Sequence, residues 1–260
     1  MRILFVADVF GAPGRRAVET RLPELRHELG AGFCVVNGEN AADGAGLTAK
    51  LATRLLERGA DVVTTGNHVW RHRDLVPVLE SSARVLRPAN LGGLGAPGRG
   101  LTVVPAGDGT RVAVINLQGG LFMDTQVHPF LVAEELVAEA RRETPIILVD
   151  FHAEATSEKI ALARMLDGHA TAVIGTHTHV QTNDARVQPG GTAALTDAGM
   201  TGPHDSVIGV SAELAIERMR TGMPVRFHPG HGDVRIEGVL VECGADGRAT
   251  RCETVRVPVG

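Results

Sequence analysis

Short apolar runs alternate with helix-like segments along most of this 260-residue chain, and this alternation restricts its fold more than any other feature. The runs predicted as strands cover residues 2–7, 33–37, 61–65, 146–150, 171–175 and 192–196. Helices are predicted between them, over residues 13–29, 48–58, 71–80, 131–142, 157–166 and 212–220. Repeated strand–helix units indicate an α/β fold with a largely parallel central sheet and helices outside it.

Two segments depart from the alternation. Residues 101–104 and 112–117 are predicted to pair antiparallel through a Gly-Asp-Gly turn, and residues 234–242 and 250–257 form a closing hairpin. These pairs indicate mixed sheets, and two stacked sheets would accommodate them. The Gly- and Pro-rich stretch 85–100 is predicted to be an irregular loop rather than a dinucleotide cradle, because no strand–helix unit surrounds it. Since no linker or repeat interrupts the chain, we expect a single domain over residues 1–260.

The composition excludes several classes of protein. The formal net charge of -4 gives no general grip on nucleic acid, which needs a basic face. A small phosphate-bearing substrate remains compatible, because bound metal ions can supply positive charge. The three cysteines are widely spaced, and Cys34 lies in an apolar run that predicts a buried thiol and a reducing compartment. No apolar run reaches the length of a membrane span or a signal peptide, so we expect a cytoplasmic protein without a membrane partner.

A His-x-His pair follows one of the predicted buried strands. The apolar run ends at Gly175, and His177 and His179 come directly after it. Residues two apart in an extended backbone point the same way, so both imidazoles can face one point. Such a pair suits a divalent metal, although the pattern alone is weak.

Matching side chains stand at the ends of the other predicted strands. Five successive strand ends carry Asp8, Glu39 with Asn40, Asn67 with His68, His152, and His177 with His179. Each has an ordinary alternative: a helix cap for Asp8, turn residues for Asn40 and Asn67, a hydrogen-bonded core histidine for His152. Because ligands collect at the carboxyl ends of strands in such folds, we favour a joint metal site over these separate explanations. Asp150 is predicted to support a ligand rather than bind the metal.

The donor set indicates which metals the site would hold. It contains oxygens and imidazole nitrogens and no thiolate, which favours Mn²⁺ or Fe, with Zn²⁺ as the alternative. The donors outnumber what one ion with an open position requires. A bridging carboxylate can hold two ions roughly 3.5–4 Å apart, and Glu39, in the middle of the set, is the predicted bridge.

At this point the sequence resembles a known family. The strings GEN at 38–40, GNH at 66–68, INLQG at 115–119, DFHAEATSEK at 150–159, GTHTHVQT at 175–182 and TDAGMTGPHDS at 196–206 are similar to the calcineurin-like metallophosphoesterases, and closely to their YmdB-like branch. The resemblance implies a four-layer α/β/β/α sandwich of two mixed sheets flanked by helices. It also implies a dinuclear metal centre and hydrolysis of 2′,3′-cyclic nucleotides. The net charge disfavours a metal-dependent RNA-binding protein, while an RNA-end cyclic phosphate is a compatible substrate.

The resemblance also assigns roles to residues. The implied metal ligands are Asp8, Glu39, Asn40, Asn67, His152, His177 and His179, and the implied catalytic histidine is His68. One position departs from the common pattern of the superfamily, where the first motif reads Asp-x-His. Here Phe10 stands at the histidine position and cannot ligate, so Asn40 is the candidate replacement.

The implied reaction is attack of a metal-bound hydroxide on phosphorus, with His68 as general acid to the leaving alkoxide. The alternative is a metal-binding regulatory or interaction protein with secondary phosphatase or 3′,5′-cyclic phosphodiesterase activity. The sequence leaves open the physiological substrate, the metal and the roles of His204 and Asp205. Apolar positions in the closing hairpin allow a homo-oligomer. The remaining histidines are predicted to lie on the surface: His27, His72, His128, His169, His228 and His231.

Overall fold

The computed structural model describes residues 1–93 and 95–259 and contains two six-stranded sheets. The first sheet is built from β1 (Arg2–Val6), β2 (Phe33–Asn37), β3 (Val62–Thr64), β10 (Gly202–Pro203), β11 (Val234–Cys243) and β12 (Ala249–Pro258). The second is built from β4 (Leu101–Pro105), β5 (Arg111–Gln118), β6 (Ile147–His152), β7 (Ala172–Thr176), β8 (Arg186–Val187) and β9 (Ala193–Leu195).

Both sheets are mixed, as the sequence predicts. In the first, β1, β2 and β3 are parallel neighbours, while β11 pairs antiparallel with β1, β10 and β12. In the second, β5, β6, β7 and β9 are parallel, and antiparallel β4 and β8 close its two edges. The parallel strands of each sheet therefore carry their carboxyl ends to one edge, where ligands collect in folds of this type.

Alternating side chains on the strands explain the stacking of the two sheets. On β1, Ile3 and Phe5 join a buried cluster that also contains Leu148 and Ile174 of the second sheet. The intervening Leu4 of β1 belongs to a different cluster, which is shared with the helices beside the first sheet. Since successive strand residues point to opposite faces, each sheet buries one face against its partner sheet and the other against helices.

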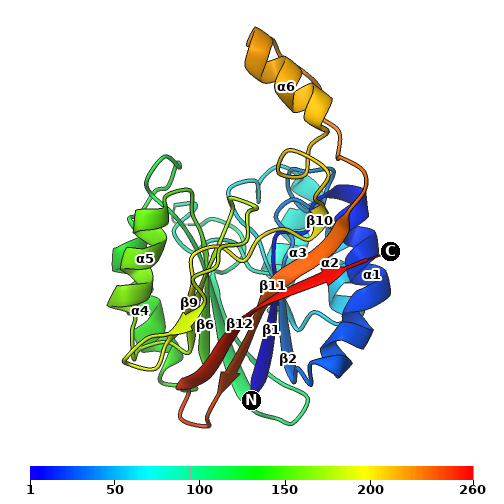
Figure 1. The fold of residues 1–260 in the computed structure, drawn as a ribbon. Coiled ribbons are helices and arrows are strands. Elements are labelled where there is room, and N and C mark those ends of the chain that lie inside the picture. The colour runs from blue at the N-terminus through cyan, green and yellow to red at the C-terminus, as the bar shows by residue number, and fades with distance from the viewer. Residues whose placement is uncertain (94, 260) are drawn as a thin grey trace.

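Helices form the two outer layers (Figure 1). The helices α1 (Gly11–Glu28), α2 (Ala49–Glu57) and α3 (Val76–Ser81) cover the first sheet, and α4 (Pro129–Ala140) and α5 (Thr156–Met165) cover the second. The four-layer α/β/β/α sandwich is therefore confirmed. The sixth helix, α6 (Ala212–Thr221), projects away from the layers. In the described part of the chain, none of the helices combines the length and apolar character that a bilayer span requires.

The structure departs from the predicted elements in a few places. The helix predicted over 71–80 is a short 3₁₀ turn, Arg73–Leu75, followed by α3. The two-residue strands β8 and β10 were missed, because so short a pairing leaves no periodic pattern. The stretch 85–100 contains no regular helix or strand in its described residues, while Leu94 lies outside them. Cys34 is buried, as predicted.

Candidate metal centre

The predicted ligands come together where the carboxyl ends of the two sheets meet. Asp8, after β1, is fully buried, and its Oδ2 accepts a hydrogen bond from the backbone N–H of His177, after β7, at 2.8 Å. Its other carboxylate oxygen, Oδ1, is buried without a hydrogen-bond partner in residues 1–93 and 95–259. A buried carboxylate oxygen without a donor is costly, and a cation would satisfy it.

The imidazole of His152, at the end of β6, is oriented by its neighbours. Its Nδ1 lies 3.0 Å from the hydroxyl of Thr176, which donates to Asp150 at 2.8 Å. Because that hydroxyl gives its proton to a carboxylate, it accepts from His152, and Nδ1 carries the ring proton. The other nitrogen, Nε2, is left with a lone pair that faces Asn67 Oδ1 at 3.0 Å.

The other two imidazoles are fixed in the same manner. Nε2 of His177 lies 3.2 Å from a carboxylate oxygen of Glu154, which leaves Nδ1 as the nitrogen with a lone pair. His179 donates from Nδ1 to the carbonyl of Ile208 at 2.9 Å, which leaves Nε2 with its lone pair. Nδ1 of His177 and Nε2 of His152 lie 3.1 Å apart. Each histidine therefore presents one unprotonated ring nitrogen, the arrangement that metal ligation requires.

The turn that carries two of these histidines has an unusual backbone. The φ angles are 99° at His177 and 64° at His179, both in the left-handed region that non-glycine residues rarely adopt. Such conformations cost of order 1–3 kcal/mol each and persist only where the surroundings enforce them. The intervening Thr178 provides that enforcement, since its N–H and hydroxyl both donate to Asp197.

Asp197 itself belongs to a buried ion pair. Lys159 of α5 donates to the same carboxylate oxygen at 2.6 Å, and the two side chains are 3% and 1% exposed. The pair thereby anchors the His177–His179 turn to the helix layer behind the second sheet. Sequence reasoning did not single out this pair, although both residues lie in the strings that carry the family resemblance.

Glu39 organises the loop that follows β3. Its carboxylate oxygens accept from the backbone N–H groups of Gly66 and His68. Gly66 has no room for a side chain, since an added Cβ would lie 2.3 Å from the ring of His152. The loop and the histidine of the other sheet are therefore packed in direct contact, which brings Asn67 and His68 beside the imidazoles.

Asn40 and Phe10 together surround His179. The amide Nδ2 of Asn40 lies 3.0 Å from Nε2 of His179, and the ring of Phe10 packs edge-on against the imidazole with 5.6 Å between centroids. Phe10 cannot bind a metal, but its ring supports the imidazole of His179. Nε2 of His179 can accept from Asn40 or bind a metal with its one lone pair, so ligation would release this hydrogen bond.

The support role predicted for Asp150 agrees with its contacts. Its carboxylate accepts from the side chains of Asn37, Thr64 and Thr176 and is fully buried. Asn37 in turn accepts from the backbone N–H of Glu39 at 3.0 Å. Asp150 therefore links the second sheet to the first behind the ligand layer.

Burial sets the charges of the centre. It raises the pKa of Asp8 to about 8 and that of Glu39 well above its usual range, because a low-dielectric site disfavours the carboxylate. It also lowers the pKa of His177 to about 4 and that of His152 well below its ordinary value. The imidazoles are accordingly neutral, the protonation state in which they can ligate.

The donor atoms are of the kinds that bind metal ions, but their positions do not surround one. As they stand, no three His, Cys, Asp or Glu side chains within residues 1–93 and 95–259 are arranged to hold an ion. Facing donors instead approach one another at hydrogen-bond distance, as His152 and His177 do. In the tautomers that the contacts with Thr176 and Glu154 favour, the two facing nitrogens of His152 and His177 both carry lone pairs, and a cation between them would relieve their repulsion.

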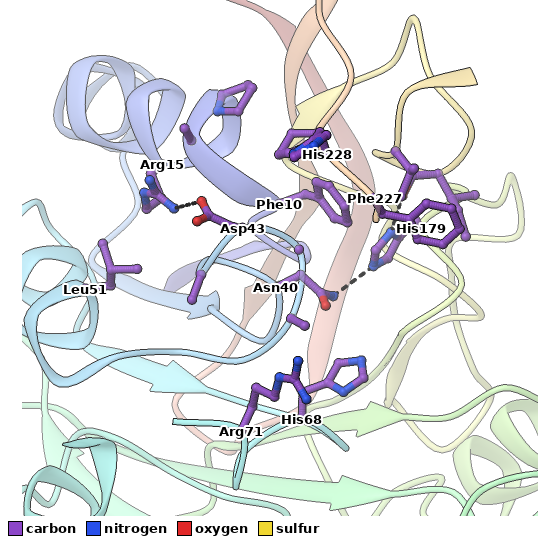
Figure 2. Close-up of a pocket in the computed structure, with 18 of the residues that line it drawn as sticks. Phe10, Arg15, Asn40, Asp43, Leu51, His68, Arg71, His179, Phe227 and His228 are labelled. Atoms are coloured by element: carbon purple, nitrogen blue, oxygen red, sulfur yellow. Dashed lines mark hydrogen bonds and ion pairs between the residues drawn. The ribbon is translucent and has the colours of Figure 1, made fainter. Parts of the chain in front are cut away.

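An open cleft of about 1390 Å³ leads to this centre (Figure 2). It is lined by Asn40, Asn67, His68, His177 and His179. The half-buried imidazole of His68 faces this cleft, and burial lowers its pKa, with the positive charge of Arg71 adding to the effect. Arg15, Arg16, Arg71 and Arg226 also line the cleft, although nothing in the sequence distinguished them from other arginines.

Five of the six histidines predicted to lie on the surface are exposed, and His72 is half-buried. His72, His228 and His231 also line the cleft, whereas His27, His128 and His169 lie outside its lining. His204 lies 3.2 Å from Glu237 and contacts the carbonyl of Gly202, so it supports β10 and β11 and does not line the cleft. Asp205 is exposed beside it.

The four layers, with carboxylate, amide and imidazole side chains gathered at the strand ends, define a protein of the metallophosphoesterase fold. A family model described as YmdB-like protein matches residues 4–255, and the chain belongs to this family. The chain is 49% identical over 242 residues to a Bacillus subtilis protein named 2′,3′-cyclic-nucleotide 2′-phosphodiesterase, and the match covers 93% of this chain and 91% of the relative.

Two solved structures share the fold over nearly their full length. A crystal structure of a hypothetical protein from Thermus thermophilus has a TM-score of 0.92 at 40% identity, and the match covers 99% of both chains. A crystal structure described as a novel phosphatase from Mycoplasma pneumoniae has a TM-score of 0.90 at 33% identity, with 99% of this chain and 93% of that chain covered.

Proposed function

We propose that this chain is a metal-dependent phosphodiesterase that opens 2′,3′-cyclic nucleotides. The observation that carries the proposal is a cluster of three imidazoles, His152, His177 and His179, each with one unprotonated ring nitrogen, around the fully buried carboxylate of Asp8. The substrate class comes from the Bacillus subtilis relative, whose name specifies a 2′,3′-cyclic nucleotide. Its identity to this chain extends over 242 residues and therefore over both sheets.

The residues proposed to hold two ions, Mn²⁺ or Fe, are Asp8, Glu39, Asn40, Asn67, His152, His177 and His179. When bound, such ions offset the negative charge that builds on the phosphoryl oxygens and lower the pKa of water. Glu39 is fully buried, and the charge of the neighbouring Asp8 adds to the rise in its pKa, which supports it as the bridge. The hydrogen bonds that His152 and His179 donate to Thr176 and Ile208, and the contact of His177 with Glu154, keep the three imidazoles in the tautomers that ligation needs.

His68 is the proposed general acid. Opening the cyclic ester at O2′ breaks the P–O2′ bond and leaves an alkoxide that needs a proton, and the imidazole faces the cleft where this oxygen would lie. Burial keeps His68 neutral in the substrate-free centre, and the negative charge of a bound phosphodiester would raise its pKa. His68 then gives its proton to O2′, and the product is a 3′-phosphate.

The test is hydrolysis of a substrate panel by protein loaded with Mn²⁺ or Fe²⁺. The panel contains 2′,3′-cyclic AMP, 3′,5′-cyclic AMP, a nitrophenyl phosphodiester and a nitrophenyl monoester. We expect selective opening of the 2′,3′-cyclic compound and a loss of roughly 10²–10⁴-fold in kcat for His68→Ala. Metal content should stay nearly intact in that variant, and His128→Ala, outside the cleft, should behave as wild type.

Each arm of this test can fail separately. Loss of metal from His68→Ala would make His68 a ligand instead of an acid. No turnover of any substrate by metal-loaded protein would overturn the phosphodiesterase assignment and favour a regulatory metal-binding protein.

A further inference from the structure

The cleft does not end at the metal centre but continues into a second hollow between α1 and α2. This outer groove, of about 380 Å³, is lined by Ala12, Arg15, Arg16, Glu19, Lys50, Leu51 and Arg54. Ala12, Arg15, Arg16 and Leu51 also line the cleft, so the two hollows adjoin each other. A ligand held at the metal centre can therefore extend along the first turns of both helices.

Positive charge is concentrated along this path, although the whole chain has a net charge of -4. The cationic side chains that line the cleft and outer groove are Arg15, Arg16, Lys50, Arg54, Arg71 and Arg226, against the acidic Glu19, Asp43 and Glu154. Among the described residues Arg16, Lys50 and Arg71 have no ion-pair partner, whereas Arg54 is paired with Glu19. A surplus of unpaired cations in a concave surface attracts a polyanion.

The first helix adds to this positive potential. It begins at Gly11, and its first turn, with Ala12 and Pro13, lines the cleft. No acidic residue occupies that turn, so the partial positive charge at the helix N-terminus is not offset within the helix. Arg15 and Arg16 extend from this end, so the dipole and the side chains act on the same region.

We propose that the outer groove binds the phosphodiester backbone of an RNA strand whose 3′ end carries the cyclic phosphate in the cleft. This inference rests on the proposed function. A 2′,3′-cyclic phosphate requires a 2′-hydroxyl, so on a polymer it occurs at the end of RNA, and the next phosphates continue on its 5′ side. The cleft alone exceeds the roughly 300–1,000 Å³ that enclose one small ligand, which leaves space for more than a mononucleotide.

The groove suits phosphates better than bases or a lipid surface. It has no aromatic lining residue on which a base could stack, and its polar side chains are cationic or paired with cations. Its concave shape between two helices admits a single extended strand, whereas a membrane surface needs an exposed protruding face. The reaction at the strand end adds water across the P–O2′ bond, gives the proton to O2′ and leaves a 3′-phosphate terminus.

The experiment compares the same terminal nucleotide free in solution and at the 3′ end of an RNA strand. Steady-state kinetics are measured on 2′,3′-cyclic AMP and on an RNA pentanucleotide that ends in adenosine 2′,3′-cyclic phosphate. The test variant is Lys50→Glu, which reverses an exposed charge that lines only the outer groove. The matched control is Arg58→Glu, an exposed cation at the opposite end of α2.

We expect wild type to have a kcat/KM for the pentanucleotide at least tenfold above that for the mononucleotide. Lys50→Glu should lower the pentanucleotide value about tenfold through KM, while 2′,3′-cyclic AMP hydrolysis changes less than twofold. The slope of log KM against log salt for the pentanucleotide should fall by about 0.7 per lost phosphate contact. Arg58→Glu should change neither substrate.

The result that would overturn the inference is equal kcat/KM for the two substrates in wild type, or a Lys50→Glu effect that is the same on both. A binding arm separates this failure from failure of the proposed function. Fluorescence anisotropy follows a labelled RNA pentanucleotide with a 3′-phosphate, the proposed product. Weaker binding by Lys50→Glu than by Arg58→Glu supports the groove even if no substrate is hydrolysed, and binding of phosphatidylglycerol vesicles as tight as that of the pentanucleotide would contradict a site for an extended strand.

Discussion

The two sheets contribute different chemistry to the centre that lies between them. The first sheet ends in oxygen donors, with Asp8, Glu39, Asn40 and Asn67 after β1, β2 and β3. The second ends in nitrogen donors, with His152 and the two histidines of the turn after β7. Burial acts on both groups, but it raises the pKa values of the carboxyls and lowers those of the imidazoles. The same desolvation therefore favours a cation beside the carboxyls of the first sheet, the oxygen half of the centre. It keeps the imidazoles of the second sheet, the nitrogen half, neutral and able to bind that cation.

This difference explains why the two halves are supported differently. The imidazoles are neutral, so a hydrogen bond to one nitrogen is enough to orient each ring, as Thr176 does for His152. The carboxylate of Glu39 accepts two backbone N–H groups from the loop after β3, while Asp8 accepts one and keeps one oxygen without a partner. We infer that the first sheet depends on metal binding for its stability more than the second.

The largest expected effect is on the oxygen half. Glu39→Gln should remove at least one bound ion and lower 2′,3′-cyclic AMP hydrolysis roughly 10³-fold, since several kcal/mol of charge stabilisation would be lost. Metal content by mass spectrometry of the purified protein, together with kcat, checks this. Glu135→Gln, on the exposed face of α4, is the control. Full metal occupancy in Glu39→Gln would rule out the bridging role.

The second prediction concerns the pH dependence of the metal-free protein. The pKa of Asp8 is about 8 in the fold against an ordinary value of 3.8, so the folded state retains a proton that the unfolded state loses between these values. Stability contributed by this protonation falls as pH rises from about 4 to 8. Asp8→Asn in chelator-treated protein should thus gain stability over wild type with rising pH, by a few kcal/mol at pH 9, since one pKa unit corresponds to about 1.4 kcal/mol.

The nitrogen half should show the opposite sign. The pKa of His177 is about 4 in the fold against 6.5, so the unfolded state takes up the proton first and stability rises with pH between these values. His177→Gln should therefore lose stability relative to wild type as pH rises from 4 to 6.5. Urea denaturation of both chelated variants at several pH values checks the pair. The same sign for the two variants would contradict the division into an oxygen and a nitrogen half.

The smallest effect is expected for a residue that contacts a predicted ligand without itself binding a metal. Thr176→Val removes the hydroxyl that fixes the tautomer of His152 and should lower metal affinity about 10–100-fold, the usual cost of losing such a partner. Competition with a chelator of known affinity measures it. Thr102→Val, buried on β4 away from the strand ends, is the matched control. Unchanged metal affinity in Thr176→Val would show that His152 keeps its tautomer without the Thr176 hydroxyl.

The sequence was sufficient to predict the layers and the convergence of the polar strand ends, because both follow from local patterns. An apolar run that ends in Asp8 or in a His-x-His pair marks a strand and its carboxyl end, and parallel strands bring such ends together. It could not predict the contacts that depend on distant segments. The ion pair of Lys159 with Asp197 joins residues 38 positions apart and leaves no periodic signal.

The distribution of charge was hidden for a related reason. A net charge of -4 sums over the entire surface, so it conceals the cations that α1 and α2 bring to one groove. The helix over 212–220 was predicted correctly, yet a helical pattern does not reveal that Ala215 alone of its residues is buried and that the helix projects from the body.

The central claim is that donors from both sheets hold two metal ions at one site. Anomalous X-ray diffraction from crystals of protein reconstituted with Mn²⁺ tests it most directly. We predict two anomalous peaks between the strand ends, each contacted by side chains of both sheets, with Glu39 touching both ions. A single peak held by the histidines alone, or no peak there in protein that hydrolyses 2′,3′-cyclic AMP, would contradict the claim.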